Sequence, residues 1–153
     1  MPNWCNNRVN LSDNGNTEQF DRLVKILDGP NPFNEIFPSP DWNNIPNEDG
    51  ELPVRKEFKN PNGEVSFVTM EFPKSGKNDD RWYDWNIQNW GTKWDMCDKH
   101  TAEIDEGWAE FGFMTAWSPA YGIFDKIKED FPDVGISWFY DEPGMEVAGY
   151  LPN

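Results

Sequence analysis

Tryptophan and asparagine side chains give this chain its clearest capacity for binding chemistry. They gather over one short stretch of sequence, and a further Trp follows in a later segment. An indole offers a large contact area and one N–H donor, and a neighbouring amide can grip a peptide or a planar ligand. The same residues would also suit a buried core with a few polar groups. The candidate ligand or partner site comprises Trp82, Trp85, Asn86, Asn89, Trp90, Lys93, Trp94 and Trp117.

Lys93 is the cation in that set, and it has two interpretations. It stands between Trp90 and Trp94 in a chain that is poor in Lys and Arg. It could therefore meet an anionic group of a ligand or partner. The alternative is a salt bridge with a nearby acid such as Asp95.

The C-terminal third of the sequence is strongly acidic. Residues 101–153 hold 11 Asp and Glu against Lys126 and Lys128, a net charge of −9. Such a surface can simply keep a protein in solution, or it can imitate the phosphate charge of DNA and occupy a basic groove on another protein. The candidate acidic face comprises Asp125, Glu129, Asp130, Asp133, Asp141, Glu142 and Glu146.

Catalytic and metal-binding patterns are weak. Asp95, Cys97, Asp98 and His100 are metal-ligand types, but a single Cys-x-x-His without a second pair is a poor zinc pattern. His100 is the chain's one histidine, so a nucleophilic triad would depend on it. No Gly-rich phosphate loop is present, while acid–base chemistry by a carboxylate pair, for instance through Glu110, stays open. We expect no metal and no cofactor, and we favour a protein without catalytic activity.

Composition restricts the remaining classes. The 153 residues include 28 acids and 13 basic residues, for a net charge of −15, which disfavours direct binding to a nucleic-acid backbone. Nine Trp argue for a folded core rather than an acidic disordered chain. No apolar run reaches the roughly 18 residues that span a bilayer, no signal-peptide pattern opens the chain, and Cys5 and Cys97 match no disulfide framework. We expect one soluble, cytoplasmic domain with reduced thiols and no membrane association.

Periodicity predicts the elements of the first half. Residues 8–12 alternate as a half-buried strand does, and Asn16 can cap a helix over 17–28. The segment from 30 to 76 is rich in Pro, Asn and Gly, with a hairpin that pairs 52–58 with 64–70. An aromatic helix over 81–90 then ends at Gly91.

The second half predicts more strands than helices. A strand near 102–105 precedes one over 108–117, which places Phe111, Phe113, Thr115 and Trp117 on one face. Ser118 and Pro119 suit the N-cap and first position of a helix over 119–131. A terminal hairpin joins 134–140 to 145–151 across a turn at 141–144. This order predicts an α+β fold, a mainly antiparallel sheet with helices on one face.

Four motifs resemble a known family. They are Met1-Pro2-Asn3-Trp4-Cys5-Asn6-Asn7, Trp82-Tyr83-Asp84-Trp85 through Trp90-Gly91-Thr92-Lys93-Trp94-Asp95, Phe113-Met114-Thr115-Ala116-Trp117-Ser118-Pro119, and Tyr140-Asp141-Glu142-Pro143-Gly144. In this order they resemble the uncharacterised YubB-like family of bacteriophage and plasmid proteins. The resemblance implies a ferredoxin-like fold over residues 1–153 and a bacterial host cytoplasm. It implies no catalytic residues, and the loop or hairpin segment at about 38–78 looks like an insertion.

Three functions follow as hypotheses. The first is a non-catalytic phage or plasmid accessory protein that binds a host or phage macromolecule through the Trp-rich surface, the acidic face, or both. A host or phage protein is the expected partner. The second is an acidic DNA mimic that blocks a host nucleic-acid-binding protein. The third is binding or turnover of a small nucleotide-like ligand in a Trp/Asn-lined pocket. The oligomeric state stays open.

Overall fold

A computed structural model describes residues 2–152 of the chain. These residues form two compact units: a main unit, residues 2–38 with 85–152, and a small unit, Ser39–Asp84. The boundary between them falls within one helix, α3 (Arg81–Asn89). Each unit is described by itself below.

The main unit is built on a five-stranded antiparallel sheet. Its strands are β1 (Trp4–Ser12), β4 (Cys97–Asp105), β5 (Trp108–Ala116), β6 (Gly135–Glu142) and β7 (Val147–Leu151). They lie in the order β4-β5-β1-β6-β7, so the first strand of the chain is the central one. The expected antiparallel sheet and α+β class are therefore confirmed.

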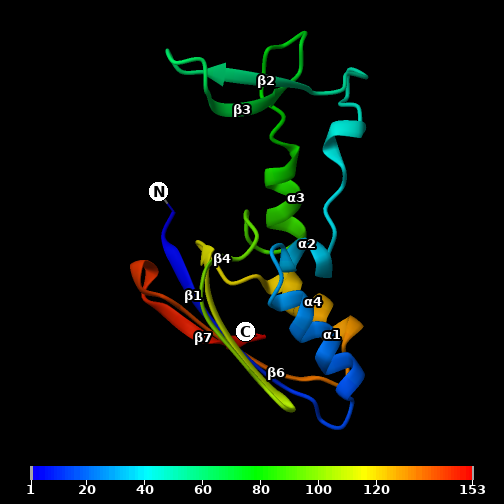
Figure 1. Ribbon diagram of the computed structural model, residues 1–153, viewed down its shortest axis with the longest axis vertical. Coiled ribbons are helices and arrows are strands. Elements are labelled where there is room, and N and C mark those ends of the chain that lie inside the picture. The colour runs from blue at the N-terminus through cyan, green and yellow to red at the C-terminus, as the bar shows by residue number, and fades with distance from the viewer. Residues whose placement is uncertain (1, 153) are drawn as a thin grey trace. The chain divides into compact units, whose positions relative to one another are not determined.

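Helices cover one face of this sheet. The helices α1 (Thr17–Leu27), α2 (Pro32–Ile36) and α4 (Tyr121–Asp130) lie on the same side of the strands (Figure 1). In β1 the side chains of Val9 and Leu11 are buried against them, while Arg8 on the opposite face is exposed. Period-two alternation explains this difference, because successive strand residues point to opposite faces.

The first helix follows the predicted capping pattern. The Asn16 side chain accepts a hydrogen bond from the Gln19 backbone N–H at 3.1 Å, which satisfies one of the free donors of the first turn. The buried residues of α1 are Phe20, Leu23, Val24 and Leu27, the four that the sequence places on one face. The helix predicted over 17–28 is confirmed.

Two predictions at the end of β5 are wrong. The strand ends at Ala116, and Trp117 takes a left-handed backbone conformation with φ +70° instead of extending the buried face. Ser118 does not cap the next helix, because α4 begins after Ala120 and the Ser118 hydroxyl donates to the Gly91 carbonyl at 2.6 Å. The side chain is thus committed to another segment of the chain.

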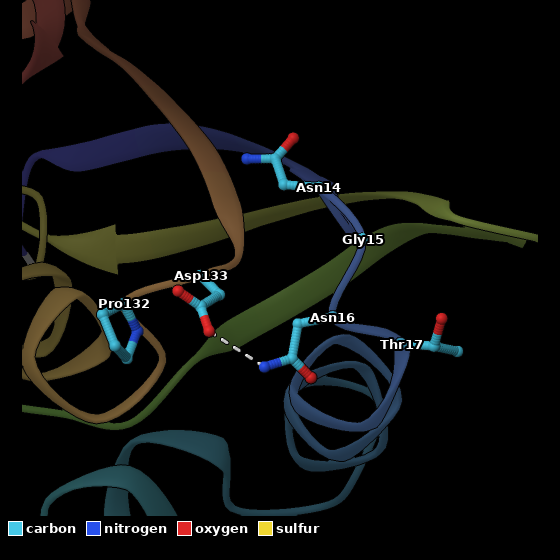
Figure 2. A pocket seen from close by; sticks show the side chains of 6 residues that line it. All are labelled: Asn14, Gly15, Asn16, Thr17, Pro132 and Asp133. Atoms are coloured by element: carbon cyan, nitrogen blue, oxygen red, sulfur yellow. Dashed lines mark hydrogen bonds between the residues drawn. The ribbon is translucent and has the colours of Figure 1, made fainter.

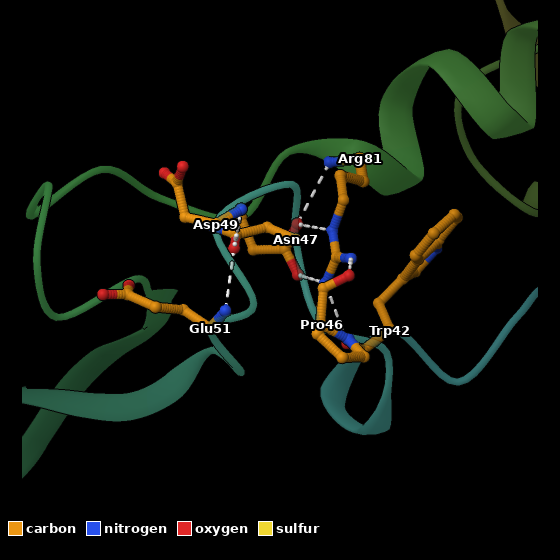
Figure 3. Close-up of polar contacts among 7 residues, drawn as sticks. Trp42, Pro46, Asn47, Asp49, Glu51 and Arg81 are labelled. Atoms are coloured by element: carbon orange, nitrogen blue, oxygen red, sulfur yellow. Dashed lines mark hydrogen bonds and ion pairs between the residues drawn. The ribbon is translucent and has the colours of Figure 1, made fainter.

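The small unit contains a hairpin and a loop held by one arginine. It comprises a 3-10 turn (Trp42–Asn44), β2 (Val54–Lys59) and β3 (Val65–Glu71), which pair antiparallel as the sequence predicts. The Arg81 guanidinium donates to Asp79 at 2.8 Å and to the carbonyls of Trp42 and Pro46, and Figure 3 shows it against that loop. The hydrogen bonds from Arg81 lower the pKa of the Asp79 carboxyl from its ordinary value of 3.8.

Candidate functional site

The segment after β5 is fixed by hydrogen bonds in an unusual backbone conformation. A left-handed φ is rare for a bulky residue and costs about 1–3 kcal/mol unless its surroundings enforce it. Here the Trp117 N–H donates to the Asn3 carbonyl at 2.8 Å, and the Thr115 hydroxyl donates to the Ser118 carbonyl at 2.6 Å. The Asn7 amide in turn donates to Thr115 at 2.9 Å. The result is a Trp117 side chain that stays 46% exposed beside the sheet.

Gly91 brings a second aromatic side chain to the same place. Its φ is +88°, and an added Cβ would lie 2.8 Å from the backbone nitrogen of Tyr121. Only a residue without a side chain lets these two segments approach so closely. This contact sets the start of α4, and Tyr121 lies at its first position.

Trp117 and Tyr121 both line a pocket at one end of the sheet, beside the start of α4. Its volume is about 280 Å³. Tyr121 and Tyr140 meet in an edge-to-face arrangement, with ring centroids 6.5 Å apart. We call this site the Trp117–Glu142 pocket, and its lining residues are Trp117, Ser118, Pro119, Tyr121, Tyr140, Glu142, Met145 and Val147.

Glu142 is the charged group of the pocket and is almost fully buried. It ends β6 with its side chain on the same face as Trp138 and Tyr140, and it is 2% exposed. One carboxylate oxygen, Oε2, accepts from the Met145 N–H, which closes the short turn after the strand. The other, Oε1, has no hydrogen-bond partner within residues 2–152. A buried acceptor without a donor is costly, so such groups call for an explanation.

No ion pair within residues 2–152, the part of the chain that the structure describes, compensates the charge of Glu142. A nearby titratable group is the Cys5 thiol, whose pKa is raised to about 11, chiefly by burial and further by the carboxylates of Glu142 and Asp141. Cys5 is therefore a neutral thiol at physiological pH.

Aromatic walls and a buried carboxylate together favour a cationic guest. Aromatic faces attract cations through their quadrupole, and the attraction is strongest where water is excluded. A cation that also carries an N–H would supply the donor that Oε1 lacks.

The other predicted tryptophans do not join Trp117 in this pocket. Trp85 and Trp90 pack on one another at 5.9 Å, and the Trp90 indole is buried and donates to the Phe37 carbonyl at 2.8 Å. Trp94 is exposed, and its ring centroid lies 6.1 Å from that of Trp4. Trp82 belongs to the small unit, where it contacts Tyr83.

The polar members of the predicted site serve the chain itself. The Asn86 amide donates to the Lys93 carbonyl at 2.7 Å, and the Asn89 amide donates to the Trp85 carbonyl at 2.9 Å. The Lys93 ammonium lies 4.2 Å from the centre of the Trp94 ring.

Asp95, considered as a partner for Lys93, has another role. Its two oxygens accept from the backbone N–H groups of Phe33 and Asn34, both at 3.0 Å, in the first turn of α2.

The predicted acidic face is divided among separate places. Asp125, Glu129 and Asp130 lie on α4, where Lys126 pairs with the last two at 3.7 and 3.5 Å. Asp133 precedes β6 whereas Glu146 follows it, so the strand, roughly 25 Å long, separates them. Asp141 lies on the uncovered face of the sheet. Glu142 is a correction: alternation along β6 turns it inward, so it is not part of an exposed surface.

Two other hollows are less convincing as sites. The hollow in Figure 2 lies at the start of α1, and its Asn16 and Asp133 side chains are already joined by a hydrogen bond of 3.0 Å. A hollow on the uncovered face is lined by Arg8, His100 and Phe139, among others. Arg8 lies 3.7 Å from Glu110 there, and both hollows lack a buried unpaired group.

Sequence reasoning found only part of the pocket. Trp117 and Glu142 were candidates, but in two separate sets, and Tyr121, Tyr140 and Met145 were not singled out. One signal was available: the alternation of Trp138 and Tyr140 continues to Glu142, which places a carboxylate on the buried face. The sequence instead suggested a turn that begins at Asp141.

Metal and membrane features are few in the part of the chain that the structure describes. Within residues 2–152, no group of three or more His, Cys, Asp and Glu could hold a metal ion. In the same range, no helix combines the length and the apolar character needed to cross a membrane.

Comparison of the chain with known protein families, with curated proteins and with solved structures found no match.

Proposed function

We propose that the protein is a non-catalytic binding protein whose Trp117–Glu142 pocket takes a cationic side chain from a basic protein partner. The unpaired Oε1 of the buried Glu142 is the observation that carries this proposal. In a free protein it represents a lost hydrogen bond. A partner that donates an N–H to it would recover that interaction, and with it a charge-assisted hydrogen bond.

Arginine is the side chain that fits best. Its guanidinium always carries N–H donors and a positive charge, stacks on aromatic rings, and is more weakly hydrated than an ammonium. Trp117 and Tyr121 offer such rings at the mouth, with 46% and 38% of their surface exposed. A trimethylated ammonium would use the rings but has no N–H for Oε1. Buried arginine anchors are also frequent hot spots of protein interfaces.

The charge of the chain supports a basic partner. A net charge of −15 attracts basic surfaces and speeds their encounter, particularly at low ionic strength. We infer a host or phage protein as that partner and a phage or plasmid accessory role, following the motifs that resemble the YubB-like family.

We further infer a ferredoxin-like fold for the main unit. The order β1, α1, β4, β5, α4, β6 is a β-α-β-β-α-β series, and the neighbours β4-β5-β1-β6 are all antiparallel. These features support that assignment. The strand β7 would then be an addition at one edge.

The other hypotheses have less support. A DNA mimic needs a continuous anionic strip, whereas the acids of α4 are partly paired with Lys126 and lie apart from Asp141. A nucleotide-like ligand in a Trp/Asn-lined pocket needs free amides. The NH2 groups of Asn86 and Asn89 both donate to backbone carbonyls, and within residues 2–152 only the Asn86 Oδ1 is buried without a partner among the atoms of these two amides.

The proposal is tested by titrating the protein with N-acetyl-arginine amide. Binding is monitored through the NMR signals of the Trp117 indole and the Tyr121 ring. A ligand of this size is expected to bind with a Kd of about 1 mM. N-acetyl-citrulline amide, which has the same shape without the charge, is the matched control. Saturable shifts for arginine, confined to the pocket and much weaker for citrulline, are expected. Equal responses to both compounds, or none, would refute a cation site.

A further inference from the structure

The hairpin of the small unit has apolar side chains on its surface. Val54, Val65 and Phe67 are 54%, 47% and 56% exposed, and Val68 is 41% exposed. Phe58 and Phe67 stack across the two strands, with ring centroids 4.5 Å apart. A sheet of two strands is only marginally stable by itself in water, and a third strand or a covering layer stabilises it.

One edge of this hairpin is partly covered by the chain itself. Beside β3, the Asp79 N–H donates to the Met70 carbonyl at 2.7 Å, and the Phe72 N–H donates to the Lys77 carbonyl at 2.9 Å. Asn78 forms an antiparallel bridge with Glu71 between them. A third strand therefore begins to form on this edge but extends no further along β3.

The rest of the same edge is available for pairing. The Met70 carbonyl points away from β2, and alternate residues of a strand direct their backbone groups to the same side. The N–H and C=O of Val68, two residues earlier, therefore point outward as well. No backbone hydrogen bond from Val68 to a segment outside the hairpin is described within residues 2–152.

The charge of the hairpin indicates which partner can pair with this edge. Residues 54–71 hold Arg55, Lys56 and Lys59 against Glu57, Glu64 and Glu71, so the hairpin is neutral in a chain of net charge −15. The six residues from Val65 to Met70 carry no charge at all. Two copies of a strongly acidic chain can therefore approach through a strand segment that is itself uncharged.

We propose that the protein self-associates by antiparallel pairing of the β3 edges of two copies. The pair forms a four-stranded sheet in the order β2-β3-β3-β2, related by a two-fold axis. A two-fold interface requires a surface that is complementary to itself, and an uncharged, β-branched edge strand meets this condition. This inference concerns the small unit alone and does not depend on the cation pocket.

The test is the concentration dependence of the molar mass, measured by sedimentation equilibrium from micromolar to millimolar protein. The wild type is expected to rise from 17.8 kDa toward twice that mass. Added salt is expected to strengthen the association, because it screens the repulsion between two acidic chains. Association through opposite charges would instead weaken with salt.

Two proline variants locate the interface. Val68→Pro removes the outward N–H of β3, a position at which an edge strand tolerates proline, and is expected to weaken association at least tenfold. Glu57→Pro makes the same change on the β2 edge, since Glu57 lies opposite Val68, and is expected to dimerise like the wild type. Val68→Lys, which places a charged side chain on this apolar edge, is expected to act as Val68→Pro does.

Three outcomes would overturn the inference. A wild type that stays at 17.8 kDa over the whole concentration range excludes self-pairing. Unchanged association in both Val68 variants places any interface elsewhere, as does loss of association in Glu57→Pro alone. Far-ultraviolet circular dichroism of each variant shows that the fold is retained, and Val68→Lys keeps the test valid if the proline variant does not fold.

Discussion

Substitution of Glu142 by Gln should leave the stability of the protein unchanged or raise it. A buried carboxylate that forms its hydrogen bonds normally contributes to stability, whereas an acceptor without a donor costs about 1–3 kcal/mol. Glu142→Gln keeps an oxygen for the Met145 N–H, at a loss of about 1 kcal/mol because a neutral acceptor is weaker. It also replaces the unpaired charged oxygen by a neutral NH2 group, whose burial without a partner costs less than that of a charge. The expected net change is between 0 and about 2 kcal/mol in favour of the variant.

Urea unfolding, followed by circular dichroism, measures this difference. Glu142→Ala is expected to destabilise by about 2 kcal/mol, since it leaves the Met145 N–H without its acceptor and empties the space of a buried side chain. Glu146→Gln removes an equal charge four residues away at an exposed position and should stay within about 0.5 kcal/mol of the wild type. If Glu142→Gln destabilises by more than about 2 kcal/mol, the carboxylate is a structural group and the reasoning fails.

Three further predictions concern groups outside that carboxylate. Gly91→Ala should destabilise by about 3 kcal/mol in urea unfolding, because the left-handed φ and the contact with Tyr121 both disfavour a Cβ. The lowered pKa of Asp79 stabilises the fold at pH above its ordinary value of 3.8, and this contribution is lost as the pH falls through the folded-state pKa. Asp79→Asn should therefore cost about 2 kcal/mol at pH 7 and progressively less in acid, as measured by unfolding at several pH values. Cys5, with a pKa of about 11 and no exposure, should react with a disulfide reagent at pH 8 only after unfolding, which a thiol assay with and without urea would detect.

Most of the fold was predictable from local pattern. Alternation located the strands of the sheet, and the helical spacing of Phe20, Leu23 and Leu27 located α1, because both patterns arise from the periodicity of the backbone. The capping role of Asn16 was equally local. These inferences require no knowledge of which distant residues meet.

The candidate site was less predictable because long-range contacts build it. Ser118 has the local pattern of an N-cap, but its hydroxyl bonds to Gly91, 27 positions earlier in sequence. Trp117 follows the alternation of β5, yet its backbone is held by Asn3 in a conformation that the pattern does not suggest. Glu142 is acidic and close to a Pro-Gly turn, which favours exposure. The burial of Glu142 can be predicted only when β6 is known to extend as far as residue 142.

The most direct test of the account is a thermodynamic cycle between Glu142 and the charge of the ligand. Binding of N-acetyl-arginine amide and N-acetyl-citrulline amide is measured by NMR titration for the wild type and for Glu142→Gln. A charge-assisted hydrogen bond of about 2 kcal/mol corresponds to roughly a 30-fold preference for arginine in the wild type. The account predicts that this preference falls to within about threefold in Glu142→Gln, a coupling that a cycle isolates. An arginine preference that is equal in both proteins would show that Glu142 does not receive the cation, and would contradict the account.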